Sequence, residues 1–264
     1  MSDILEQIVA HKHVELVAQQ EQLPLRELVA RVEHAPRRES LSMRASLASS
    51  SSGIIAEFKR KSPSKGWIFP EAIPTEVVPS YADAGAAALS ILTDEDYFGG
   101  SMGYVEQVRG LVPCTPILRK DFIIDRYQLF QAKLIGADAV LLIASCLSPA
   151  ECRQLAAEAH QLGLETLLEV HTEAELDYVG EDIDMVGVNN RHLGTFHTDV
   201  AVSFALAGKL PKDFLLVSES GISKAETIRQ LRAAGFRGFL IGEALMRTPH
   251  PGDTLRQLIA DIQA

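Results

Sequence analysis

Eight short apolar segments recur along the chain, and each is almost continuously apolar rather than alternating. They are residues 54–58, 87–93, 116–120, 138–144, 165–170, 184–189, 214–219 and 238–242. Such runs are typical of parallel strands that are covered on both faces, because no side of the strand meets water. A parallel sheet needs a crossover between consecutive strands, so this feature limits the chain to α/β folds.

Helical patterns fill the intervals between the apolar segments. Residues 125–136 and 148–163 each open on a favoured N-cap residue and end on glycine. In residues 223–235, Ser223 and Glu226 have the spacing of a capping box. Eight strand and helix units in succession predict a (β/α)8 TIM barrel. An open doubly wound sheet is the competing fold, but no GxGxxG turn follows the first segment.

The residues before the first apolar segment form a separate region of the sequence. Residues 3–20 and 24–33 have helical patterns, and a serine-rich linker, SLASSSSG, follows them. We expect an N-terminal helical extension at 1–50 that belongs to the same domain, and a catalytic barrel at 51–264. Such an extension could cap the bottom of the barrel or flank its mouth.

Composition and charge exclude several classes of function. The 264 residues carry a formal net charge of -10, which argues against a nucleic-acid partner. No uncharged apolar run approaches the roughly 20 residues that span a membrane, and no export signal is visible at the start. The three cysteines have no CxxC spacing, so we expect a reducing, cytoplasmic location.

Polar residues stand where the apolar segments end, which is where a barrel of this kind carries its chemistry. Glu57 and Lys59 are two residues apart and point the same way on a strand. They could form a structural ion pair, but burying one is costly unless its geometry is very good, so we favour a catalytic pair. Lys120 could serve as an acid or form a Schiff base, with a pKa lowered by apolar walls and other cations. We expect Glu169 to be a general acid or base whose pKa is raised by its apolar walls.

Later strand ends supply groups for binding anions. Asn189 and Arg191 can orient a hydroxyl and a carboxylate. Ser220, Gly221, Gly242 and Glu243 lie after the seventh and eighth segments, where barrels commonly bind phosphate through backbone N–H groups. Ser62 from the first loop could join them, within a basic island that comprises Lys59, Arg60, Lys61, Ser64 and Lys65.

Histidines predict little here. His171, His192 and His197 have no metal-binding spacing, and lone histidines in loops are usually solvated. We therefore expect no metal and no cofactor.

Several long motifs together carry a family resemblance. They are IAEFKRKSPSKG, LSILTDEDYFGGS, PILRKDFIIDRYQL, GADAVLLI, LLEVHTEAEL, VGVNNRHLGTF, VSESGI and FLIGEALMR, in residues 54–248. In this order they resemble indole-3-glycerol phosphate synthase of tryptophan biosynthesis. The resemblance implies a cofactor-free closure of 1-(2-carboxyphenylamino)-1-deoxyribulose 5-phosphate to indole-3-glycerol phosphate, with loss of carbon dioxide and water.

The same resemblance implies roles for individual residues. The family's acid lysine falls on Lys120 and its base glutamate on Glu169, while Glu57 orients Lys59. Asn189, Arg191, Glu219 and Ser220 would fix the hydroxyls and the carboxylate of this phosphosugar-anthranilate substrate, and Phe98 and Phe122 would pack its aromatic ring. His192 and Glu243 stand where family members vary, and a glutamate would repel phosphate unless only its backbone N–H points inward.

Three other functions compete with this one. They are another phosphosugar barrel such as a phosphoribosyl isomerase, an aldolase with a Schiff base on Lys120, and a catalytically silent binding barrel. The silent barrel predicts broken catalytic positions, whereas the polar residues named above are all present. Transient contact with other enzymes of the tryptophan pathway is a further expectation.

Overall fold

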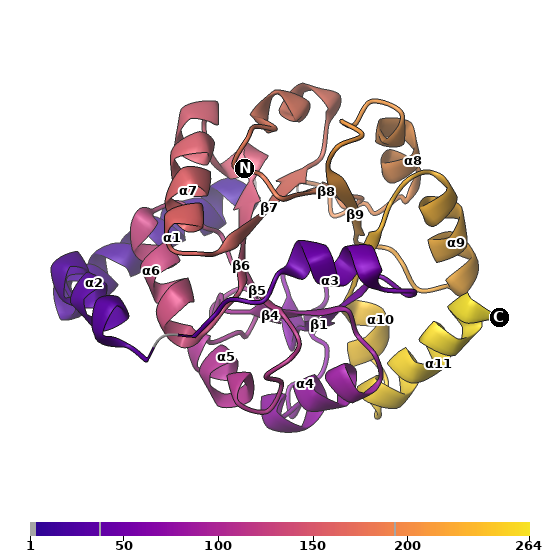
Figure 1. Ribbon diagram of the computed structural model, residues 1–264, viewed down its shortest axis with the longest axis horizontal. Coiled ribbons are helices and arrows are strands. Elements are labelled where there is room, and N and C mark those ends of the chain that lie inside the picture. Colours follow the sequence, from indigo (N-terminus) through magenta and orange to yellow (C-terminus); the bar gives the residue numbers. More distant parts are fainter. Residues whose placement is uncertain (1–3, 37, 193) are drawn as a thin grey trace.

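Eight parallel strands form a closed barrel in the computed structural model, which describes residues 4–36, 38–192 and 194–264 (Figure 1). The strands are β1 (Ile54–Phe58), β4 (Ala88–Leu92), β5 (Ile117–Lys120), β6 (Ala139–Ile143), β7 (Glu165–Val170), β8 (Met185–Asn189), β9 (Leu215–Glu219) and β10 (Gly238–Ile241). Each of these strands pairs with the next one along the chain, and pairing of β1 with β10 closes the barrel. The eight predicted strands and the barrel are confirmed, and the open sheet is excluded.

A short hairpin follows β1 and is absent from the prediction. It consists of β2 (Lys61–Ser62) and β3 (Gly66–Trp67), which pair antiparallel. Two-residue strands have too little apolar pattern to stand out in a sequence, because only the tertiary context pairs them.

Helices surround the barrel on its outer face (Figure 1). They are α4 (Pro74–Asp83), α5 (Met102–Arg109), α6 (Arg126–Ile135), α7 (Pro149–Gln161), α8 (Ala201–Ala207), α9 (Ala225–Ala233), α10 (Glu243–Met246) and α11 (Pro251–Gln263), with 3-10 turns at Ala144–Cys146 and Glu173–Tyr178. The caps of α6 and α7 agree with prediction, since Asp125 and Ser148 both form capping boxes. The capping box predicted at Ser223 is wrong, because α9 begins one residue later with Lys224 as its N-cap and no side-chain bond.

The N-terminal extension reaches both ends of the barrel. Its helices are α1 (Ile4–Gln22), α2 (Leu25–His34) and α3 (Met43–Ser49). The serine-rich linker was predicted too long, because α3 includes Ser49 and is capped by the Ser42 side chain, which accepts from the Ala45 N–H. The α3 helix lies across one end of the barrel in Figure 1 and buries Met43 and Leu47 there. Contacts of Ser42 with Glu165 and of Ser46 with Ala87 place it at the amino ends of the strands.

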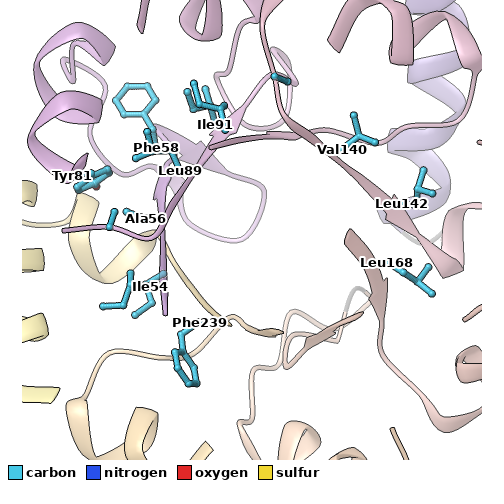
Figure 2. Close-up of a cluster of buried hydrophobic side chains, with 14 of the residues drawn as sticks. Ile54, Ala56, Phe58, Tyr81, Leu89, Ile91, Val140, Leu142, Leu168 and Phe239 are labelled. Atoms are coloured by element: carbon cyan, nitrogen blue, oxygen red, sulfur yellow. The ribbon is translucent and has the colours of Figure 1, made fainter. Parts of the chain in front are cut away.

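Apolar side chains fill two layers. One layer lies between the strands and the outer helices, and Figure 2 shows part of it with Phe58, Tyr81, Leu142, Leu168 and Phe239. The other layer fills the barrel interior. Successive strand residues alternate between the two layers, so apolar side chains are needed on both faces of the strands. Within the described residues, no helix is long and apolar enough to span a membrane.

A fully buried carboxylate, Asp138, joins the extension to the amino end of the barrel. It accepts from Arg38 Nη1 and Arg109 Nη1 at 2.7 Å each, and from the Ile117 N–H at 2.8 Å. If the carboxylate were removed, Arg109 would keep a largely buried charge and Arg38 a partly buried one, and an unpaired buried charge is costly.

We therefore expect Asp138→Asn to lower the free energy of unfolding by about 3 kcal/mol, as measured by urea denaturation. The matched control is Asp253→Asn, because Asp253 pairs with Arg256 on an exposed helix face and should stay within about 0.5 kcal/mol of wild type. Equal stability of the two variants would contradict a stabilising role for Asp138.

Candidate active site

A cavity of about 660 Å³ opens at the carboxyl ends of the barrel strands. The predicted site residues that line it are Glu57, Lys59, Phe98, Lys120, Asn189, Arg191, Glu219, Ser220, Gly221, Gly242 and Glu243. Parallel pairing explains this convergence, because every strand ends on the same rim; Asn189, for example, lies opposite Glu219. Glu169, Ser62 and Phe122 do not line this cavity, and their positions are described below.

Lys120 lies at the centre of the polar cluster. Its Nζ lies 3.1 Å from Glu169 Oε2 and 3.8 Å from Glu219 Oε2. The other oxygen of Glu169 accepts from Asn189 Nδ2 at 3.0 Å. The two glutamates are almost fully buried, whereas 15% of the Lys120 side chain is exposed. The lysine is thus the member of this cluster best placed to meet a bound molecule.

The expected pKa shifts of Lys120 and Glu169 are both wrong in direction. Burial alone would lower the Lys120 pKa, but the charges of Glu169, Glu219 and Glu57 outweigh burial and raise it. Burial alone would raise the Glu169 pKa, but Lys120, His171 and the Asn189 hydrogen bond lower it well below its usual value. Sequence reasoning anticipated the burial of each group and missed the opposite charges around it.

Glu219 is the carboxyl group whose pKa is raised. Burial, followed by the negative charge of Glu169, raises the pKa of Glu219 to about 8. The cluster therefore holds an ionised carboxylate, a carboxyl group that keeps its proton near neutral pH, and a protonated lysine. Two glutamates with opposite tendencies beside one lysine form an acid–base arrangement.

Two glycines make room for these carboxylates. A Cβ at Gly242 would lie 2.3 Å from Glu57 Oε1, and one at Gly187 would lie 2.3 Å from Glu219 Oε1. Gly242 therefore allows the Glu57 carboxylate to lie close to the backbone, in addition to its place in the turn after β10. Glu57 in turn pairs with Lys59, whose Nζ lies 2.7 Å from Glu57 Oε1, as the spacing predicted.

Cations gather around the loops after β1, β8 and β10. Arg191 Nη1 donates to Ser64 Oγ at 2.8 Å, and Arg191 Nη2 donates to Glu243 Oε2 at 3.4 Å. Arg247 pairs with the other oxygen of Glu243 at 2.7 Å. Arg247 was missed by sequence reasoning, and its position one helical turn after Glu243 was the available signal.

The remaining predicted ligands differ in accessibility. Ser220 and Gly221 both have positive φ, 67° and 77°, and strain of this kind at a non-glycine residue is common at functional sites. Ser62 is 2% exposed, and its Oγ has no hydrogen-bond partner among the described residues. Phe122 is also buried, with its ring centroid 5.9 Å from that of Phe98.

His171 is a neighbour of the cluster that sequence reasoning treated as a solvated loop residue. Only 12% of its side chain is exposed, and Nε2 lies 3.4 Å from Glu169 Oε1 while Nδ1 lies 3.7 Å from Glu175 Oε2. These carboxylates outweigh burial and raise the His171 pKa. The available signal was its position two residues after Glu169, one residue beyond the end of β7.

A closed barrel with lysines, carboxylates and arginines around one mouth defines an acid–base enzyme for an anionic small molecule. Residues 5–258 match the family described as indole-3-glycerol phosphate synthase. The chain is 58% identical over 263 residues to the Bacteroides thetaiotaomicron protein of that name, covering 100% of both. It is 46% identical over 264 residues to the Acidithiobacillus ferrooxidans protein, covering 99% of this chain and 100% of the other.

The chain belongs to the indole-3-glycerol phosphate synthase family. It is a carboxy-lyase of tryptophan biosynthesis that acts on a small phosphate-containing substrate.

Two solved structures resemble the fold alone. The 3-hexulose-6-phosphate synthase of Salmonella typhimurium has a TM-score of 0.64 at 13% identity, covering 80% of this chain and 98% of the other. Tryptophan synthase subunit alpha of Legionella pneumophila has a TM-score of 0.60 at 15% identity, covering 84% and 96%.

The raised pKa of Glu219 predicts a pH-dependent loss of stability. Between the unfolded pKa of a glutamate and the folded pKa near 8, the unfolded state loses its proton and the folded state keeps it. Stability is full below this window and falls as pH rises through it, by at most about 1.4 kcal/mol per pH unit.

We expect Glu219→Gln to remove this slope, so the variant should gain stability relative to wild type from pH 5 to pH 8 in urea titrations. Glu226→Gln, at an exposed position of α9, should track the wild type across the range. Parallel pH profiles for Glu219→Gln and wild type would contradict the raised pKa.

Proposed function

We propose that the cavity closes the ring of 1-(2-carboxyphenylamino)-1-deoxyribulose 5-phosphate, with Lys120 as general acid. The observation that carries this proposal is the position of Lys120 Nζ, between Glu169 and Glu219 and open to the cavity. The negative charge around it, that of Glu169 above all, raises the pKa of Lys120, so the lysine enters the reaction as a proton donor. A general acid in hydrogen-bond reach of the reacting oxygen typically accelerates a reaction by about 10²–10⁴.

Ring closure then proceeds in three stages. The aromatic carbon that bears the carboxylate attacks the ketone carbon, and Lys120 gives a proton to the ketone oxygen. The bond to the carboxylate breaks, carbon dioxide leaves, and its electron pair restores the aromatic ring. In the last stage the new hydroxyl takes a proton from Lys59 and leaves as water, while the CH2 of the new ring loses a proton and the C–C double bond forms. Glu169 is the base of that stage, supported by a lowered pKa that leaves it ionised.

The pair of Glu57 and Lys59 supports the same chemistry from β1. Glu57 is buried, and it fixes the Lys59 ammonium at 2.7 Å. We assign to Lys59 the binding of substrate oxygens and a share in proton transfer. Asn189 would act through Glu169, to which it donates a hydrogen bond, and would orient that carboxylate towards the proton it removes.

The phosphate group is assigned to the side formed by the loops after β1, β9 and β10. Backbone N–H groups at Ser220, Gly221 and Gly242 are the proposed donors, together with Ser62. Glu243 presents its carboxylate to Arg191 and Arg247, which frees its backbone N–H for an anion and meets the objection that a glutamate would repel phosphate.

The substrate carboxylate and hydroxyls are assigned to Asn189, Arg191, Glu219 and Ser220. The aromatic ring is assigned to Phe98 and Phe122, whose rings are 5.9 Å apart at an angle of 42°.

Wider properties of the protein follow as further proposals. We infer that the extension at 1–50 and the barrel at 51–264 act as one domain, supported by the buried contacts of α3 and Asp138. A cytoplasmic location is supported by three free cysteines. Transient contact with other enzymes of the tryptophan pathway stays a prediction.

Lys120→Ala tests the acid assignment. We expect kcat for ring closure, followed by indole fluorescence, to fall by about 10²–10⁴, because alanine cannot give a proton to the ketone oxygen. Lys224→Ala, at the exposed N-cap of α9, is the matched control and should retain wild-type kcat. Normal turnover by Lys120→Ala would end the assignment.

The same cluster disfavours the aldolase with a Schiff base on Lys120. Such an enzyme needs a neutral amine, and the three carboxylates raise the pKa of Lys120 instead. We expect no covalent adduct by mass spectrometry after treating enzyme and substrate with borohydride. A trapped adduct on Lys120 would favour the aldolase chemistry.

A further inference from the structure

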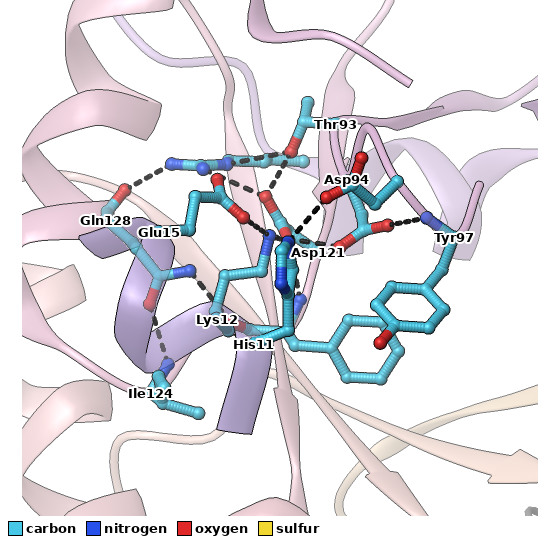
Figure 3. Close-up of polar contacts among 12 residues, drawn as sticks. His11, Lys12, Glu15, Thr93, Asp94, Tyr97, Asp121, Ile124 and Gln128 are labelled. Carbon is cyan, nitrogen blue, oxygen red and sulfur yellow. Dashed lines mark hydrogen bonds and ion pairs between the residues drawn. The ribbon is translucent and has the colours of Figure 1, made fainter. Parts of the chain in front are cut away.

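A lysine on the N-terminal extension is almost completely buried at the mouth of the barrel. Lys12 of α1 is 1% exposed, and three carboxylates surround its Nζ (Figure 3). The distances are 2.7 Å to Glu15 Oε2, 3.0 Å to Asp94 Oδ2 and 3.2 Å to Asp121 Oδ1. A buried cluster of charges is a costly way to attach a helix, because apolar residues of similar volume often serve as well or better.

The two aspartates belong to the barrel and directly follow neighbouring strands. Asp94 lies just beyond β4, and Asp121 follows Lys120 at the end of β5. Both are buried, and Asp121 has further partners in Arg119 and Thr93. Lys12 therefore spans two strand ends and holds their carboxylates against one ammonium.

The same two aspartates also bind the backbone that carries the aromatic side chains. Asp94 uses the oxygen that does not face Lys12, and Asp121 uses the oxygen that does. Asp121 Oδ1 accepts from the Phe122 N–H at 2.8 Å. Asp94 Oδ1 accepts from the Tyr97 N–H at 2.9 Å, one residue before Phe98. Figure 3 shows the bond between Asp94 and Tyr97 beside the lysine. The ammonium thus contacts two carboxylates that position Phe98 and Phe122 through the main chain.

Apolar contacts of α1 reach the same place. Leu5 and Ile8 belong to the buried cluster that includes Phe122, with Tyr97 and Phe98 packed against it. The His11 ring meets the Tyr97 ring edge-on, with centroids 5.8 Å apart. The helix therefore packs behind Phe98, which lines the cavity, and Phe122, which lies buried beside Phe98.

We propose that Lys12 is a positioning residue that sets α1 against the ends of β4 and β5 and so fixes Phe98 and Phe122 as a binding wall for an aryl ring. The proposal rests on the proposed function of those two rings. The proposed backbone donors to phosphate follow β9 and β10, whereas the carboxylates that Lys12 contacts belong to α1 and to the segments after β4 and β5. Loss of Lys12 should therefore weaken aryl binding and spare phosphate binding, a split that a general loss of stability would not produce.

The experiment compares two probes on Lys12→Met, which replaces the lysine by an apolar side chain of similar length. The probes are 2-aminobenzoate, followed by its fluorescence, and inorganic phosphate, followed by calorimetry. We expect a tenfold or greater loss of 2-aminobenzoate affinity, a rise in KM of about 10–10², and phosphate affinity within twofold of wild type. Unchanged 2-aminobenzoate affinity and KM in the folded variant would overturn the proposal.

Two control variants separate positioning from stability. Lys133→Met removes a part-buried lysine that ties the extension to α6 through Ser40, away from the mouth. Asp138→Asn weakens the protein from the amino end of the barrel. We expect both to keep the wild-type KM at a temperature where they are folded. Equal rises in KM for Asp138→Asn and Lys12→Met would reduce Lys12 to a structural residue.

Asp94→Asn keeps the proposal testable if Lys12→Met does not fold. An asparagine oxygen can still accept from the Tyr97 N–H, while the ion pair with Lys12 is lost. We expect the same selective loss of aryl affinity, and a wild-type response would overturn the proposal.

Phe122→Ala tests the proposed ring site itself. If this variant binds 2-aminobenzoate normally, the proposed ring site fails. If it loses 2-aminobenzoate affinity while Lys12→Met keeps it, only the role of Lys12 fails.

Discussion

Closure of the parallel barrel is the constraint on which the site depends. Because β1 pairs with β10 and all eight strands run the same way, residues at the ends of distant segments meet on one rim. Lys120 of β5, Glu169 of β7 and Glu219 of β9 come into contact only through that closure. The end of each strand puts one side chain on the rim, and closure of the barrel sets the distances between these side chains.

Charge compensation governs the chemistry of the rim. Burial opposes the charged forms of Lys120 and Glu169, yet the pKa of each shifts in the direction that favours its charged form, because each faces the other. For Glu219, burial and the negative charge of Glu169 outweigh the positive charge of Lys120, so its pKa is raised and it keeps its proton near neutral pH. One lysine among three carboxylates thus produces a proton donor, a base and a neutral carboxyl group within a few ångströms.

The N-terminal extension links the two ends of the barrel. At the amino ends of the strands α3 buries Met43 and Leu47, while at the carboxyl ends α1 places Lys12 between Asp94 and Asp121. The sequence left open whether the extension caps the bottom or flanks the mouth, and the structure shows that it does both. A helical pattern reports which face is apolar, but not what that face will cover.

The amino-acid pattern by itself determined the strands, the barrel and most residues at the mouth. Apolar runs fix strands wherever they occur, and a polar residue at the end of a run marks the rim. Only the tertiary structure decided the pKa directions of Lys120 and Glu169, the burial of His171 and the contacts of Lys12. Each of these depends on which charges approach within a few ångströms from distant segments, and Coulomb energies vary too steeply with distance and burial for a linear pattern to encode them.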